Sequence, residues 1–487
     1  MTLRLLIKEI VDENPIAEGE VRYRLLFRQL QQAILQGRLP AGAKLPATRE
    51  LADLLGIARN TVKSSYEMLA AEGYIDSKTG AGSFVAELPE AWLKPKAIVE
   101  EVSEPLVISD YANKLLDLRP LNSDVKRLLQ PAIPSLDHFP IAQWKRCLGS
   151  AAGRIGLLSS PPEGVLMLRE QIADYLLKNR GIEVPAKQII VTSGSQQAAY
   201  MVAHLLTNSG DQVLVETPGF QGTAGAFSAA GCQISTISLD HFCQTDLHSG
   251  ISLISVTPSR NFPLGHTLPL ETRLSLIHWA EESGGWILED DYDSEYAVGR
   301  PVSAIYSISE RQRVIYTGTF SRSMFPSLRL GYLVLPKALV SVFAQARRYM
   351  DGGLSQVPQV AMAEFMQQGF FARHLKKMKQ LYMEKSTYCL DAITSNRWLG
   401  SLPILDAEGG MHIVLGLPDG MDDAKLVSEL NQSGLGVRAL SGYCQGGEKI
   451  KGLVIGFCFE NYREIDQGVD LIASHFKHCL DQLDQVK

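Results

Sequence analysis

The sequence predicts two domains of different fold class: a small N-terminal domain of helices and one hairpin, and a larger α/β domain whose mainly parallel sheet carries helices on both faces. The first observation is length, because 487 residues exceed what one hydrophobic core usually serves. The second is a series of three helix-like segments and one hairpin-like segment within residues 21–87. The third is a regular alternation of apolar strand-like runs with helical segments after residue 113.

The charge of the chain is unevenly distributed. The formal net charge of -6 argues against a protein that coats nucleic acid through its overall charge. Residues 21–87 differ, because nine Lys and Arg outnumber six Asp and Glu there and give the segment a net charge of +3. A basic domain within an acidic chain favours a local nucleic-acid surface.

The cysteines and the apolar runs indicate the compartment. Seven cysteines are widely spaced and form no C-x-x-C pair, so we expect a reduced cytoplasmic protein without a metal site. The opening residues lack the apolar core of a secretion signal, and no later stretch reaches about 18 uninterrupted apolar residues. We therefore expect neither secretion nor a membrane span.

The small domain is expected over residues 21–87, after an N-terminal extension of residues 1–20. Apolar residues recur at helical spacing from Tyr23 to Leu35, and the Gly- and Pro-containing GRLPAG ends that segment. A second helix is expected to start with Thr48 as its N-cap and to end at Gly56.

A third helix and a hairpin complete the small domain. The helix is expected to open at Arg59 or Asn60 and to stop at Gly73. The following YIDSKTGAGSFVAEL alternates, breaks at Gly80 and Gly82, and resumes. Two helices, a tight turn, a third helix and a hairpin form the order of a winged helix-turn-helix, whose third helix enters the major groove.

The segment from GRLPAGAKLPATRELADLLG to YIDSKTGAGSFV closely resembles the DNA-binding domain of the GntR family. The resemblance implies a double-stranded DNA operator as partner. A single basic residue of this kind also fits a solvated surface, but the whole set favours DNA contact. By the resemblance, the DNA-binding residues are Arg49 at the start of the second helix, Arg59, Thr61 and Lys63 around the third helix, and Lys78 and Gly82 in the wing.

Residues 88–113 are expected to form a linker, because they contain three prolines, mixed charge and no sustained period. The large domain is expected over residues 114–487. Seven strand-like runs stand out there: QIIVTS, DQVLVET, CQISTISL, ISLISVTP, GWILEDD, RVIYTG and LGYLVLP.

Five segments of the large domain resemble fold type I, pyridoxal-phosphate-dependent aminotransferases as fused in the MocR/GabR regulators. They are VTSGSQQA, VETPGFQG, TPSRNFPLG, LEDDYDSEY and YTGTFSRSMFPSLRLGYLVLP. The resemblance implies cofactor contacts by Ser195, Gln196, Phe220, Asn261, Asp290, Tyr292, Thr319, Ser321, Arg322 and Arg329.

Each of these contacts has a chemical role in the family. Ser195 and Gln196 open a helix whose free amides favour a phosphate, and Thr319, Ser321 and Arg329 would complete that site.

The remaining contacts concern the cofactor ring. Phe220 would stack on the ring, Asn261 and Tyr292 would reach its phenolic oxygen, and Asp290 would keep the pyridine nitrogen protonated.

The sequence departs from the family at the Schiff-base lysine, because the corresponding position between Ser321 and Ser323 holds Arg322. A Schiff base needs a neutral amine, which a guanidinium does not supply, and the general base of transamination is missing as well. We therefore expect a domain without transaminase activity. It would bind the cofactor noncovalently, take a preformed aldimine or another anionic ligand through Arg322 and Arg329, or have lost the site.

Five further positions each allow two interpretations. Arg438 in GLGVRALSGY resembles the family's ligand for the carboxylate of an effector, but also fits a salt bridge at a strand end. His412 in GGMHIVLG fits a core histidine better than a ligand. The acids that follow Asp290 also fit a solvated turn; they are Asp291, Asp293 and Glu295.

The leading functional hypothesis is a homodimeric regulator whose small domain reads DNA and whose large domain dimerises and senses an amino-acid or pyridoxal-phosphate-related effector. The alternative is an aminotransferase that carries a DNA-binding appendage, against which Arg322 counts heavily. A third reading makes the large domain a dimerisation scaffold with an empty site.

Overall fold

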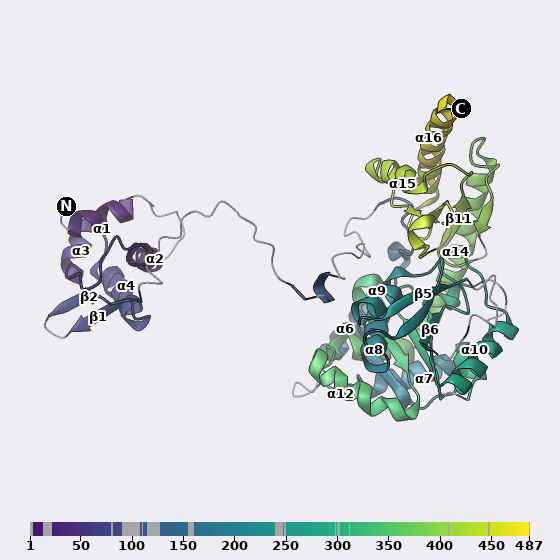
Figure 1. The fold of residues 1–487 in the computed structure, drawn as a ribbon, viewed down its shortest axis with the longest axis horizontal. Coiled ribbons are helices and arrows are strands. Elements are labelled where there is room, and N and C mark those ends of the chain that lie inside the picture. Colours follow the sequence, from purple (N-terminus) through teal and green to yellow (C-terminus); the bar gives the residue numbers. More distant parts are fainter. Residues whose placement is uncertain are drawn as a thin grey trace. The chain divides into compact units, whose positions relative to one another are not determined.

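The computed structural model forms two compact units, residues 1–107 and 108–487, which are considered separately (Figure 1). The described residues are 3–12, 22–78, 81–89, 108–109, 111–113, 127–153, 160–238, 247, 250–297, 299, 302–310, 312–407, 409–446 and 449–486.

From residue 22 on, the first unit has the predicted order of elements, and an additional helix, α1, precedes them. The elements are α1 (Leu3–Asp12), α2 (Arg22–Leu35), α3 (Thr48–Leu55), α4 (Arg59–Ala71), β1 (Ile75–Lys78) and β2 (Gly82–Val85). The two strands pair antiparallel, and Gly56 ends α3 in the left-handed conformation. One detail was wrong: Ala47, not Thr48, precedes the first turn of α3, where its amide donates to the Glu50 carboxylate at 3.4 Å.

Helix α1 belongs to the core of the first unit, although the sequence was interpreted there as an extension. Ile7 and Ile10 are buried and pack in one hydrophobic cluster with residues of α2, α3 and α4. Their spacing places both on one helix face, while Leu5 on another face is 55% exposed.

The second unit is built on a seven-stranded sheet, and all seven predicted strands are present. Their order is β3-β9-β8-β7-β6-β4-β5, and β9 alone runs antiparallel to its two neighbours. The strands are β3 (Ile189–Thr192), β4 (Gln212–Glu216), β5 (Gln233–Ile237), β6 (Ile251–Val256), β7 (Trp286–Asp291), β8 (Val314–Thr319) and β9 (Gly331–Val334).

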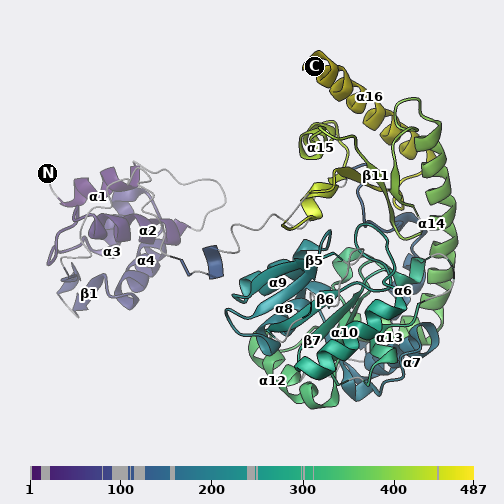
Figure 2. The ribbon, with the colours of Figure 1, turned by 45° about the vertical axis from the view of Figure 1, so that its right-hand side comes forward.

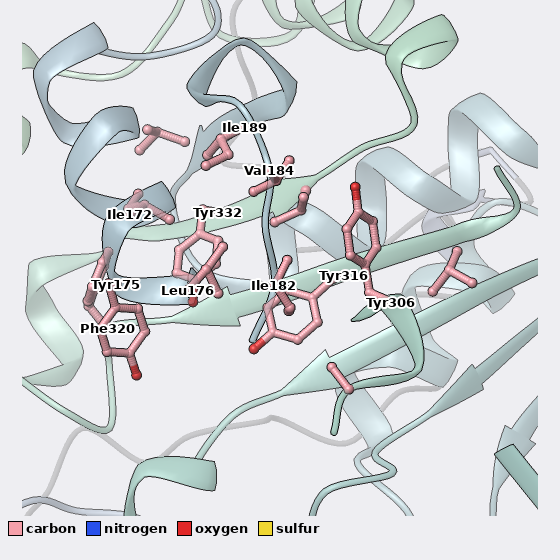
Figure 3. Packing of buried hydrophobic residues seen from close by; sticks show 14 of the residues in the cluster. Ile172, Tyr175, Leu176, Ile182, Val184, Ile189, Tyr306, Tyr316, Phe320 and Tyr332 are labelled. Carbon is pink, nitrogen blue, oxygen red and sulfur yellow. The ribbon is translucent and has the colours of Figure 1, made fainter. Parts of the chain in front are cut away.

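Helices cover both faces of this sheet, as predicted. Along β3, Ile189 and Val191 pack in one hydrophobic cluster, while Ile190 packs in another, because successive side chains of a strand point to opposite faces. Figure 3 shows part of the first cluster, where α7 places Ile172 and Leu176 beside the sheet. The helices around the sheet are α6 (Ile141–Gly153), α7 (Leu166–Arg180), α8 (Ser195–Leu206), α9 (Gln221–Ala229), α10 (Leu270–Ser283), α11 (Ile305–Ile308), α12 (Val340–Met350) and α13 (Gln356–Gln367).

A second sheet forms a C-terminal subdomain that the sequence had not suggested. The long helix α14 (Phe370–Ser395) runs from the first sheet toward it (Figure 2). The other elements are β10 (Ile404–Asp406), β11 (His412–Gly416), α15 (Asp423–Gln432), β12 (Arg438–Ala439), β13 (Gly452–Gly456) and α16 (Tyr462–Val486). The four strands pair antiparallel in the order β10-β11-β13-β12.

Most of the predicted linker, residues 88–113, lies outside the described residues. Its last described residues pack on the second unit: the hydroxyl groups of Tyr111 and Tyr200 are 3.1 Å apart, and the Tyr200 ring stacks on His204. Among the described residues, no helix combines the length and the apolar character needed to cross a membrane.

The packing of α1 predicts an unequal effect of two substitutions. Ile7→Ala removes a fully buried side chain and should lower the local free energy of unfolding of the first unit by about 2 to 4 kcal/mol. Leu5→Ala, on the exposed face, should change it by less than about 0.5 kcal/mol. Hydrogen exchange of the α2 to α4 amides in the full chain measures both. Equal protection in the two variants would contradict the role of α1 in the core.

Candidate functional site

The predicted DNA-contact residues of the helices lie at exposed helix starts. Arg49 is exposed in the first turn of α3, and Arg59 is the first residue of α4. Lys63 is exposed one turn further along α4, where its ammonium lies 3.6 Å from Glu67, and Thr61 is half-buried. Val62 and Tyr66 hold α4 in the core, so the basic residues remain on the outer face of this helix.

The wing brings together a basic cluster that includes a residue missed in the sequence. Lys78 and Gly82 are partners in the hairpin, and the Lys44 and Lys78 ammonium groups each lie 5.8 Å from the centre of the Phe84 ring. Gly82 has a φ of +108°, and a Cβ there would lie 3.1 Å from Cε of Lys44. The bridge between Lys44 and Phe84 was not visible in the sequence, because it joins the hairpin to an irregular segment.

Asp290 lies at the C-terminal end of β7 in the second unit. It is 7% exposed, and its Oδ1 has no hydrogen-bond partner among the described residues. Burial, together with Asp291 and Glu216, raises the pKa of Asp290 to about 7, although Arg322 opposes the rise. An unpaired buried acid at a strand end is suited to a ligand that donates a hydrogen bond, such as a protonated ring nitrogen.

Arg322 lies in the loop that follows β8. Its guanidinium donates to the carbonyl of Ala132, and its own backbone carbonyl accepts from the Tyr296 hydroxyl at 3.4 Å. Burial lowers the pKa of Arg322, while Asp293, Tyr292, Tyr443 and Asp290 oppose that shift.

The residues predicted to bind a phosphate surround the start of α8. Gly194 precedes the helix with a φ of +113°, and a Cβ there would lie 3.9 Å from the Arg329 guanidinium. The hydroxyl groups of Thr319 and Ser321 are 3.1 Å apart beside the neighbouring strand ends. Backbone amides at a helix start together with a guanidinium and hydroxyl groups form a suitable phosphate cradle.

Aromatic rings from several segments of the second unit meet at Phe262. Phe262 makes edge contacts with Phe220, Tyr292 and Tyr443 at centroid distances of 6.3, 5.7 and 5.0 Å. The predicted stacking residue Phe220 precedes the first turn of α9. Phe262 was not among the predicted site residues, because the resemblance to the family implies a role only for its polar neighbour Asn261.

Two residues predicted to contact the cofactor, Asn261 and Gln196, donate hydrogen bonds from their amide groups to other atoms of the protein. Asn261 donates its amide nitrogen to Glu216 at 3.1 Å and to the carbonyl of Pro218 at 3.2 Å. Gln196 donates to the carbonyl of Gly222 at 2.8 Å and so joins α8 to α9. The Asn261 amide therefore donates a hydrogen bond to Glu216, whose pKa is raised by burial to about 7.

The acids after Asp290 do not form a solvated turn. Asp291 lies 2.7 Å from Nε of Arg180 and accepts from the Tyr316 hydroxyl at 2.6 Å. Asp293 is 1% exposed and lies 3.6 Å from Arg260.

Glu295 has a similar role, because it accepts from the Tyr175 hydroxyl at 2.7 Å. Asp291 and Asp293 are therefore buried and paired, and the half-buried Glu295 is hydrogen-bonded, so none of the three acids is a freely solvated side chain.

The two remaining candidates lie in the C-terminal subdomain. His412 is a core histidine, as expected: it is buried on β11 and its Nε2 lies 2.7 Å from the carbonyl of Pro263. Arg438 is half-buried on β12, and its charge and that of Arg322 both lower the pKa of Tyr443, against a larger rise caused by burial. The charges of Arg438 and Arg322 thus both lie close enough to Tyr443 to affect its pKa.

Comparison with known proteins identifies both units. Residues 22–85 match the family described as bacterial regulatory proteins, gntR family, and residues 134–445 match aminotransferase class I and II. Over 466 residues the chain is 31% identical to the probable rhizopine catabolism regulatory protein MocR of Rhizobium meliloti, with 93% of each protein covered. The chain belongs to the MocR-type regulators of the GntR family. This MocR-type protein is a DNA-binding transcription regulator with an aminotransferase-like domain.

Other relatives and solved structures agree with this assignment. The regulator is 29% identical over 439 residues to the pyridoxine biosynthesis transcriptional regulator PdxR of Corynebacterium glutamicum, covering 89% of this chain and 91% of PdxR. A kynurenine aminotransferase of Pyrococcus horikoshii shares the fold, with a TM-score of 0.68, 24% identity, and coverage of 76% of this chain and 97% of the enzyme. Aminotransferases of this fold normally bind pyridoxal phosphate.

The position of Lys44 predicts a role in DNA affinity. Lys44→Ala removes one of the two ammonium groups that flank Phe84, so the slope of log Kd against log salt should fall in magnitude by about 1. Fluorescence anisotropy with a duplex selected by the wild-type regulator from a random pool measures this slope. Lys376→Ala on α14 removes the same charge from an exposed site on the second unit and should leave the slope unchanged.

Asp290 should make the stability of the second unit depend on pH. Its folded-state pKa of about 7 lies above the ordinary value of 3.8, so the fold favours the neutral acid, and this contribution to stability is full below pH 3.8 and is lost as pH rises to about 7.

Asp290→Asn stays neutral at every pH, and so its Tm relative to wild type should rise by on the order of a few degrees between about pH 5 and about pH 8.5. Scanning calorimetry at both pH values measures the difference. Asp481→Asn, at an exposed site on α16, is the matched control. A Tm difference for Asp290→Asn that is the same at both pH values would contradict the assignment.

Proposed function

We propose that this regulator binds a pyridoxal-phosphate-type ligand noncovalently in its large domain and does not catalyse transamination with it. Binding of the ligand changes the affinity of the regulator for DNA. The observation that carries the proposal is the combination of Arg322 in place of the lysine with an acid, Asp290, whose Oδ1 is buried without a hydrogen-bond partner among the described residues. Arg322 cannot form the covalent bond to the ligand, and Asp290 offers a hydrogen-bond partner for the nitrogen of the ligand ring.

The residues around Asp290 fit the cofactor. Pyridoxal phosphate supplies a conjugated ring that stabilises negative charge next to a reacting carbon. Asp290 would hold the ring nitrogen, and Phe220 would lie against the ring. Arg329 and the start of α8 would hold the phosphate, since a guanidinium binds phosphate through two parallel hydrogen bonds.

Arg322 changes what the site can do with a bound ligand. A guanidinium stays charged and offers no lone pair, so it neither forms a covalent bond to a carbonyl carbon nor removes a proton from the ligand. Its donors would instead hold an anionic oxygen of the ligand. The expected outcome is binding without turnover, which is the behaviour of a sensor.

The ligand class has indirect support from a relative. PdxR is named as a regulator of pyridoxine biosynthesis, whose chemistry is that of the same ring system. Arg438, which acts with Arg322 on Tyr443, would hold a carboxylate if the ligand carries an amino acid.

We also propose that the regulator works as a homodimer on paired operator half-sites. Three large apolar side chains remain exposed on α12: Val342 at 49%, Tyr349 at 84% and Met350 at 39%. Exposed apolar side chains of this kind suit a two-fold dimer contact, and a dimer places two DNA-binding domains for two half-sites.

Borohydride reduction tests the role of position 322. After incubation with pyridoxal phosphate, Arg322→Lys should give a stable adduct that peptide mapping assigns to residue 322, whereas wild type and Arg322→Met should give none there. Wild type should still show a higher Tm with the ligand, because a ligand that binds the folded state alone stabilises it. No oxo acid should form from added amino acids.

Two results would contradict the proposal. A site-specific adduct in wild type would show that another amine replaces the lysine. The absence of both a Tm rise in wild type and an adduct in Arg322→Lys would show that the pocket no longer takes this ligand.

A further inference from the structure

Helix α1 lies outside the matched GntR segment, residues 22–85, yet it is built into the DNA-binding unit. Its buried face carries Ile7 and Ile10. The amide of Gln29 on α2 donates to the carbonyl of Val11 at 3.5 Å, which fixes the C-terminal end of α1 as well. The helix is therefore held in one orientation on the unit.

The other end of α1 lies beside a predicted DNA contact. The Arg4 guanidinium forms an ion pair with Glu50, which is in the first turn of α3. Arg49, the neighbouring residue in that turn, is exposed and is one of the predicted DNA contacts. Arg4 is thus within one helical turn of the DNA-facing start of α3.

The exposed charges of α1 follow one another along the helix. Arg4 and Lys8 are four residues apart, so they share one face, and both are exposed. The acids Glu9 and Asp12 lie beyond Lys8 toward the C-terminal end, and Asp12 is one turn further along the same face. Arg4, at the N-terminal end, is the residue attached to α3.

We propose that α1 extends the DNA interface of this regulator, with Arg4 and Lys8 contacting the sugar-phosphate backbone next to the Arg49 contact. The partner is double-stranded DNA, because an exposed basic face next to Arg49 complements its phosphates. Such contacts add affinity and fix the orientation of the domain, and they carry no base specificity.

The salt dependence of DNA binding tests this inference in the full chain. The probe is a duplex that the wild-type regulator has selected from a random pool, measured by fluorescence anisotropy over a range of KCl concentrations. Lys8→Ala and Arg4→Ala should each lower the magnitude of the slope of log Kd against log salt by about 1, and the preferred sequence should not change.

Two variants separate DNA contact from other effects. Lys425→Ala on α15 removes the same charge from an exposed site on the second unit and should keep the wild-type slope. Arg4→Lys keeps the charge and should keep most of the slope. If Arg4 acted only through its ion pair with Glu50, both Arg4 variants would weaken that ion pair and would change DNA binding alike. Hydrogen exchange of α2 to α4 checks that each variant is folded.

The inference is overturned if Lys8→Ala and Arg4→Ala bind with the slope and affinity of Lys425→Ala. It is also overturned if Arg4→Lys loses as much slope as Arg4→Ala and Lys8→Ala loses none, because Arg4 would then act only through Glu50.

Discussion

The guanidinium of Arg322 is the charge on which the acids of the candidate site depend. It donates to Ala132, and it counters the burial that raises the pKa of Asp290 and of Asp293 to about 7. Buried acids without a nearby cation would be costly to ionise. A lysine would balance them equally well and would also supply a nucleophilic amine, whereas an arginine supplies the charge alone. The candidate site thus carries a cation beside its acids, and that cation lacks the amine that a covalent bond to the cofactor would need.

The two units of the regulator use charge in different ways. In the first unit, basic side chains such as Lys63 and Lys44 stay exposed at the start of α4 and at the wing, where a phosphate can displace their counterions. In the second unit, Asp291 and Asp293 are buried and paired with Arg180 and Arg260, so they stabilise the end of β7 at the candidate site. A ligand that favours one arrangement of these strand ends can change the protein's behaviour only through a difference in affinity between two states.

The sequence was sufficient to predict the fold of both units, because periodic apolar runs and local motifs lie in continuous segments, while the loss of the Schiff-base lysine at Arg322 stays a prediction. It was insufficient where the outcome depends on packing between distant segments. Helix α1 was interpreted as an extension, since nothing local indicates that Ile7 packs on α2. Lys44 joins the wing through a bridge to Phe84, and Asn261 donates to Glu216 on another strand, so neither contact has a sequence signal. Asp291 and Asp293 looked solvated for the same reason: their partners Arg180 and Arg260 are distant in sequence.

The central claim is that this MocR-type regulator converts noncovalent ligand binding into a change of DNA affinity. The most direct measurement is the Kd of the full-length protein for a selected duplex at fixed salt, without and with pyridoxal phosphate and again after dialysis. We expect the Kd to change severalfold with the ligand and to return to its first value after dialysis. A Kd that does not respond to the ligand, or a change that survives dialysis, would contradict the claim.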